Sequence, residues 1–173
     1  TDFGNIIENK TFHAVFATRT AGVGTSTLNF GDMGYADKET VSSVTLGDGQ
    51  GNGDATITLA RGASLRNDPK YYIIGNALRA YAGNTITIAS TYDGAIIKNV
   101  TFTFGDGDGT NKIKVGEEEI TDSWPGNANS VTFTISGSTG HRRIASISVT
   151  TGINGNEYTN YLTICPSLDT PTL

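Results

Sequence analysis

Apolar and hydroxyl-bearing side chains alternate in two runs near the C-terminal end of the chain. Val131, Phe133 and Ile135 share one parity, and residues 145–149 repeat the pattern after a short glycine-rich turn. A period of two predicts strands that place one face on a core and the other in water. Because only the turn separates the two runs, we interpret residues 129–150 as an antiparallel hairpin.

The same alternation recurs along the chain, interrupted by turns rich in Gly, Asn and Asp. Ile86 and Ile88 have core-facing parity, as do Val100, Phe102 and Phe104. The pattern predicts an all-β fold, with two antiparallel sheets packed as a jelly-roll-like β-sandwich. An immunoglobulin-like sandwich, which has fewer strands, is the alternative. The expected strands are 11–18, 24–30, 40–46, 55–60, 71–74, 77–81, 84–89, 96–104, 112–115, 130–136, 143–150 and 157–163.

Composition narrows the classes of partner. The 173 residues include 22 glycines and 4 prolines, which suits short strands joined by tight turns. The formal net charge of −5, without a cluster of cations, argues against nucleic acid as a partner. Apolar runs of membrane-spanning length are missing, so we expect no membrane insertion of this chain. Cys165 is the single cysteine, which excludes an internal disulfide and a cysteine-based zinc site.

Several segments form an ordered series. They are NKTFHAVFA at 9–17, DPKYY at 68–72, NALRAY at 76–81, GNTITI at 83–88, IKNVTFTF at 97–104, Trp124 with Gly126, the two strands within 129–150, and YTNYLTIC at 158–165. The first segment is similar to the closing strand of a Listeria–Bacteroides repeat, a small extracellular β module. The others resemble a β-sandwich module that follows such repeats in secreted and surface proteins of the Bacteroidetes.

This resemblance implies a domain division and a cellular setting. Residues 1–18 would be the terminal strand of a preceding repeat module, residues 19–164 the β-sandwich domain, and residues 165–173 a linker rich in Pro and Thr. The setting would be extracellular or on the outer-membrane surface, beside neighbouring domains of the same polypeptide.

The resemblance also implies a role. It predicts a non-catalytic accessory module that binds carbohydrate or a host extracellular ligand, as in adhesion, and it implies no catalytic residues. The link to carbohydrate is an analogy from fold and setting. The alternative is a structural spacer without a ligand.

Aromatic and guanidinium side chains are the candidate ligand-binding residues. An exposed Trp124 in the loop DSWPG would stack on a sugar ring, whereas a buried one would plug the end of the core. Tyr71 and Tyr72, with Arg79 and Tyr81 on the next strand, would line one face suited to hydroxyls or a carboxylate. The same four side chains would alternatively stabilise the sandwich by contacting one another.

Charged residues suggest three further sites, each with a simpler interpretation. Asp106 and Asp108 alternate in a glycine-rich loop, as Ca²⁺ ligands do, but Asp-Gly pairs are also typical of tight turns. We therefore expect no cofactor, with Ca²⁺ as the alternative. We interpret residues 141–143, HRR, as a solvated turn with anion contact as its alternative. The run 117–119, EEE, would offer carboxylates to a glycoside hydrolase, but is typical of a solvated edge, and we expect no enzyme.

Overall fold

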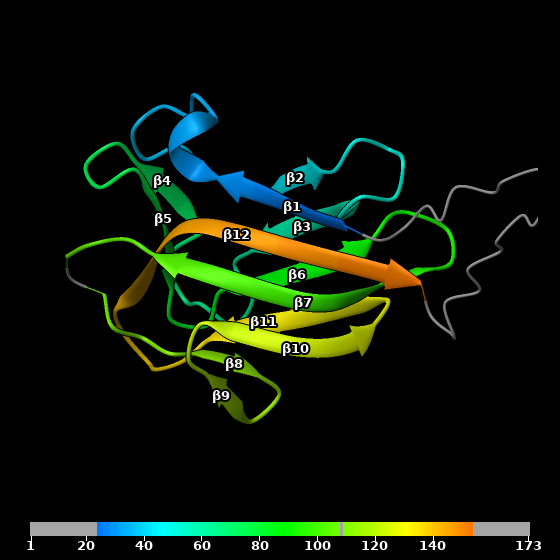
Figure 1. The fold of residues 1–173 in the computed structure, drawn as a ribbon. Coiled ribbons are helices and arrows are strands. Elements are labelled where there is room, and N and C mark those ends of the chain that lie inside the picture. Colours follow the sequence, from blue (N-terminus) through cyan, green and yellow to red (C-terminus); the bar gives the residue numbers. More distant parts are fainter. Residues whose placement is uncertain (1–23, 108, 154–173) are drawn as a thin grey trace, which may run out of the picture. The chain divides into compact units, whose positions relative to one another are not determined.

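The computed structural model describes residues 24–107 and 109–153. It confirms the all-β prediction: two antiparallel six-stranded sheets pack against each other as a β-sandwich (Figure 1). The first sheet has the order β10-β7-β12-β5-β4, with β1 also paired to β12. Its strands are β1 (Gly24–Asn29), β4 (Lys70–Tyr72), β5 (Ala77–Tyr81), β7 (Ala95–Phe104), β10 (Ser123–Ala128) and β12 (His141–Ile153).

The second sheet has the order β2-β3-β6-β11-β8-β9. The chain crosses between the sheets repeatedly, since β5, β7, β10 and β12 belong to the first sheet and β6, β8, β9 and β11 to the second. Such alternation wraps both layers around one core, as in a jelly roll. The strands of the second sheet are β2 (Ser43–Leu46), β3 (Ala55–Ala60), β6 (Thr85–Ser90), β8 (Ile113–Val115), β9 (Glu118–Ile120) and β11 (Ser130–Ile135).

Most of the core lies where the sequence parity places it. The exception is the register irregularity just after Ile144 in β12, where Ile144 is fully buried and Ala145, expected to face the core, is only partly buried. Phe102 of β7, Phe133 of β11 and Ile147 of β12 are 2%, 0% and 0% exposed. The rings of Phe102 and Phe133 meet edge to face across the two sheets, with centroids 5.0 Å apart. Burying each such side chain contributes about 1.5–3 kcal/mol, which makes the shared core the main source of stability.

The predicted hairpin at 129–150 is wrong, although both of its strands exist. β11 pairs with β6 and β8 in the second sheet, whereas β12 pairs with β1, β5 and β7 in the first. The turn between them carries the chain from one layer to the other. Alternation reports that a strand has one buried face, but the two strands bury those faces from opposite sides of one core.

Three local expectations are also corrected. β9 and β10 form where the sequence suggested loops, so Trp124 lies in a strand rather than in a loop. Phe30 does not end a strand but begins a 3-10 turn, η1 (Phe30–Asp32), and is fully buried. The expected strands 11–18 and 157–163, the division at 1–18 and 165–173, and Cys165 lie outside the described residues.

Strand β12 is the longest element and organises the first sheet. Along one edge it pairs with β7; along the other it pairs with β5 through residues 141–144 and with β1 through residues 146–151. Gly24, the first described residue, is directly opposite Thr151. The chain therefore enters and leaves the sandwich at the same end.

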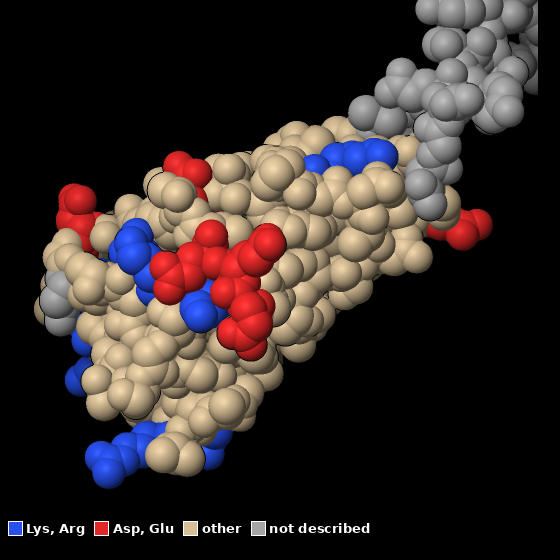
Figure 2. Space-filling model, turned by 90° about the horizontal axis from the view of Figure 1, so that it is seen from below, with Lys and Arg blue, Asp and Glu red and all other residues tan. Residues whose placement is uncertain are grey.

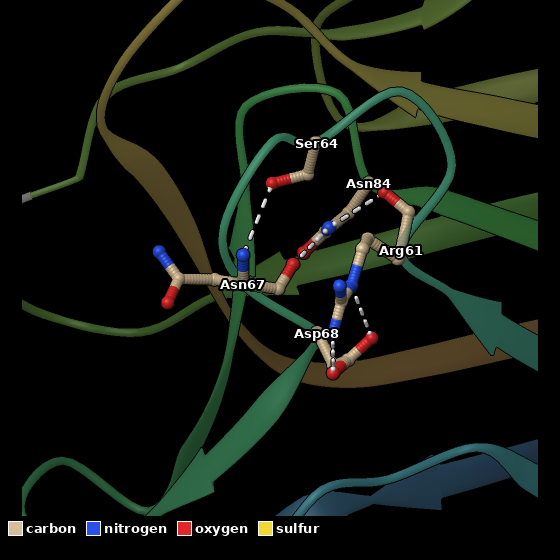
Figure 3. Close-up of polar contacts among 5 residues, drawn as sticks. All are labelled: Arg61, Ser64, Asn67, Asp68 and Asn84. Atoms are coloured by element: carbon tan, nitrogen blue, oxygen red, sulfur yellow. Dashed lines mark hydrogen bonds and ion pairs between the residues drawn. The ribbon is translucent and has the colours of Figure 1, made fainter.

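The loop between β3 and β4 is held by a buried amide (Figure 3). Asn84, 0% exposed, donates from Nδ2 to the carbonyl oxygens of Arg61 (3.0 Å) and Asn67 (2.9 Å), and its Oδ1 accepts from the backbone N–H of Tyr81 (2.7 Å). Arg61 also forms a two-point ion pair with Asp68, which lowers the pKa of that carboxyl group. These contacts replace the ladder hydrogen bonds that a loop lacks.

Candidate functional site

The four residues expected on one face divide between two faces. Tyr71 of β4 points into the core, is 4% exposed and donates from its hydroxyl to Oδ1 of Asn76 (3.2 Å). Tyr72 follows it directly and therefore points outward, because successive side chains in a strand alternate. Tyr71 is thus not part of an exposed binding face.

Tyr72, Arg79 and Tyr81 do come together on the outer face of the first sheet. The guanidinium carbon of Arg79 lies 4.1 Å from the ring centroid of Tyr72, and the hydroxyls of Tyr72 and Tyr81 are 2.8 Å apart. Burial, and then this hydrogen bond, raise the pKa of Tyr81 to about 12. The three side chains are partly buried and contact one another, which is the arrangement expected of a structural cluster.

Trp124 lies at the edge of the core. It is opposite Val100 in the β10–β7 pair, and its ring meets Phe133 edge-on with centroids 6.0 Å apart. The indole also covers Gly126 so closely that a Cβ at that position would overlap it. Trp124 is partly exposed, and its ring packs against the core.

The acidic loops are arranged as turns. Asp106 is exposed after β7, and Asp108 lies outside the described residues. Asp54 is 3% exposed, and its carboxylate accepts the backbone N–H groups of Gly49 (3.1 Å) and Gly51 (2.6 Å). Within residues 24–107 and 109–153 there is no group of three or more His, Cys, Asp or Glu side chains placed to hold a metal ion.

The prediction of a solvated turn at residues 141–143 is wrong, because β12 already begins at His141. Arg143 is 8% exposed on the outer face, where Nη1 donates to the carbonyl oxygen of Ile74 (3.4 Å). Arg142 has the opposite parity and points between the two sheets, at the end of the core. The two adjacent arginines thus lie on different faces of β12.

A pocket of about 190 Å³ opens beside Arg142, between the ends of the two sheets. The guanidinium carbon of Arg142 lies 3.6 Å from the ring centroid of Phe104, which itself packs against the core. The walls combine apolar and polar groups. The lining residues are Phe104, Asn111, Lys112, Ile113, Ile120, Thr121, Asp122 and Arg142.

Arg142 has an unusual electrostatic environment. Burial lowers the pKa of its guanidinium group, because it is partly removed from water. Its Nε atom is buried without a hydrogen-bond partner. In the part of the chain that the structure describes, the ion pairs are Lys38–Asp37 and Arg61–Asp68, and neither involves Arg142.

Charges around the pocket are mixed. Arg142 and Lys112 are the cations of its lining, and Asp122 is its carboxylate. Exposed Glu117, Glu118 and Glu119 belong to the neighbouring β8–β9 hairpin. Figure 2, which views the molecule from the side of β8 and β9, shows acidic side chains gathered there with basic ones beside them.

Sequence reasoning missed this pocket because its residues come from separate segments. Phe104 ends β7, Ile120 ends β9, and Arg142 is the second residue of β12. In addition, the alternation within residues 145–149 predicts that Arg142 faces outward. A register irregularity in the β12–β7 pair just after Ile144 reverses that parity, so Ile144 is buried and Arg142 lies on the same inward side.

Comparisons with known proteins add no assignment: no family model, curated protein or solved structure matches this chain. The resemblance to modules of Bacteroidetes surface proteins therefore stays a prediction. Among the described residues there is no helix long and apolar enough to cross a membrane.

Proposed function

We propose that this domain is a non-catalytic carbohydrate-binding module whose ligand site is the pocket beside Arg142. The composition of the pocket carries the proposal. Phe104, Ile113 and Ile120 supply apolar wall, and Asn111 and Thr121 are among the polar residues around it. A sugar ring presents both an apolar C–H face and hydroxyl groups, so it matches a site that combines apolar surface with a few polar groups.

The position of the pocket supports binding over a spacer role. Gly24 pairs with Thr151, so the two ends of the described sandwich are adjacent, and a domain with adjacent ends is a short spacer. Arg142 lies at the other end of β12, eleven residues before Ile153, which corresponds to roughly 35 Å of extended strand. The pocket therefore lies at the end of β12 opposite Gly24 and Ile153, as suits a binding module on the surface of an exported protein.

The arrangement of carboxylates in and around the pocket supports a non-catalytic role. Glycoside hydrolysis uses two carboxyl groups that flank one bond. Asp122 is the single carboxylate in the lining of the pocket, whereas Glu118 and Glu119 are exposed neighbours in β9 and have opposite parity. The run 117–119 thus does not supply a second carboxylate to this site.

A blocked-pocket variant tests the proposal. Thr121→Trp places a bulky side chain at an exposed position of the lining, and Thr58→Trp places the same side chain on the exposed outer face of β3 as a control. Binding to a glycan array and titration calorimetry with the sugars it identifies should show binding by wild type and Thr58→Trp. Thr121→Trp should lose at least tenfold in affinity. Equal binding by both variants, or no binding to any glycan, would overturn the proposal.

A further inference from the structure

We propose that the sugar bound in this pocket is acidic and that its carboxylate pairs with Arg142. This inference rests on the proposed function and names the class of its ligand. The observation behind it is a guanidinium group that lines a pocket, is partly removed from water and lacks a protein carboxylate within ion-pairing distance among the described residues.

The environment of Arg142 is costly for a charge. A cation loses hydration when it is buried, and a partner anion normally compensates for that loss. Asp122 lines the same pocket but forms no ion pair with Arg142. A ligand carboxylate at the guanidinium group would supply the missing partner.

Stacking on Phe104 prepares Arg142 for this contact. The ring occupies one face of the planar guanidinium group, with 3.6 Å between the guanidinium carbon and the ring centroid. The N–H donors lie in the plane of that group, so the stacked ring does not occupy them, and it limits the freedom of the side chain. A planar carboxylate accepts two such donors at once, with a stronger bond than a neutral hydroxyl makes.

The charge balance favours a ligand with a single negative charge. Arg142 and Lys112 outnumber Asp122, so the lining carries one net positive charge. Outside it, Glu117, Glu118 and Glu119 and the chain's net charge of −5 repel extended polyanions. An acidic monosaccharide or the acidic end of an oligosaccharide fits this pattern, and a polysulfated chain does not.

The other arginines among the described residues are less suited to binding an acidic ligand. Arg79 also has a buried Nε without a partner, but it stacks on Tyr72 beside Tyr81 and does not line the pocket. Arg143 is 8% exposed and donates to the backbone at Ile74. Arg61 already has Asp68 as its ion-pair partner. Arg142 combines a pocket wall with a guanidinium group free of such an ion pair.

Matched pairs of sugars test the inference with the full chain. Calorimetry would compare methyl glucuronide with methyl glucoside, methyl galacturonide with methyl galactoside, and sialyllactose with lactose. We expect wild type to bind at least one acidic member about 10- to 100-fold more tightly than its neutral counterpart. Arg142→Gln should lose this preference, and Arg66→Gln, which removes an exposed charge outside the pocket, should keep it.

Two further measurements keep the test decisive if Arg142→Gln does not fold. Arg142→Lys retains the charge without the planar donors and should keep only part of the preference. The preference of wild type should also shrink as salt concentration rises. Equal affinity for acidic and neutral members, with binding still lost in Thr121→Trp, would overturn the acidic-ligand inference and leave the carbohydrate proposal standing. Failure to bind any sugar would overturn both.

Discussion

At the scale of single residues, parity along a strand decides which side chains reach a site. Tyr71 and Tyr72 are adjacent, and one lies in the core while the other stacks under Arg79. The sequence contains this information, because adjacent residues of a strand cannot share a face. Arg142 and Arg143 separate in the same way. What the sequence could not predict is that Phe104 would meet Arg142, since the contact joins strands 38 positions apart.

The buried amide of Asn84 gives a prediction at this scale. Asn84→Ala removes three hydrogen bonds and leaves the carbonyl oxygens of Arg61 and Asn67 without this donor in a protein interior. We expect a loss of about 2–4 kcal/mol in the free energy of unfolding, measured by urea denaturation.

Asn127→Ala is the matched control, because the exposed Asn127 accepts only a surface hydrogen bond from Lys98. Its loss should stay within about 0.5 kcal/mol. Similar losses in both variants would mean that Asn84 does not hold the β3–β4 loop.

At the scale of elements, the sequence predicted strands better than their partners. Alternation located β7, β11 and β12, because each buries one face in the core. It missed β10, where Pro125 and Gly126 disfavour a strand, and β9, where glutamates suggested a solvated loop. Both missed strands are at sheet edges, the positions that tolerate such residues. The predicted pairing of the two strands within 129–150 was wrong because the partner of a strand depends on which sheet that strand joins.

The turn between β5 and β6 provides a prediction at this scale. Gly83 has φ +83°, and an added Cβ would lie 2.6 Å from the backbone nitrogen of Ser64. Gly83→Ala should therefore cost about 2–4 kcal/mol in unfolding free energy, from the left-handed backbone and the overlap together.

Gly94→Ala separates these two causes. Gly94 has φ +74° but has no atom within 4 Å of an added Cβ, so only the backbone cost of about 1–2 kcal/mol applies. Urea denaturation of both variants would test this difference, and equal losses would show that the close approach to Ser64 is unimportant.

At the scale of the whole sandwich, the sequence predicted the fold class and the shared core but not the position of the pocket. The core follows from side-chain burial, which the alternating pattern records directly. The pocket depends on where β7, β9 and β12 end relative to one another, and that relation is set by sheet order and register.

The pairing of Gly24 with Thr151 has a mechanical consequence. When force is applied at Gly24 and Ile153, the load reaches β1 and β12 at adjacent points, and their hydrogen bonds break one after another as in a zipper. A load applied between Gly24 and Ser138→Cys, just before the opposite end of β12, instead slides β1 along β12 and stretches many bonds together. Single-molecule pulling should give a lower unfolding force in the first geometry. Equal forces would contradict this expectation, and the lower force would make the domain an early point of extension under tension.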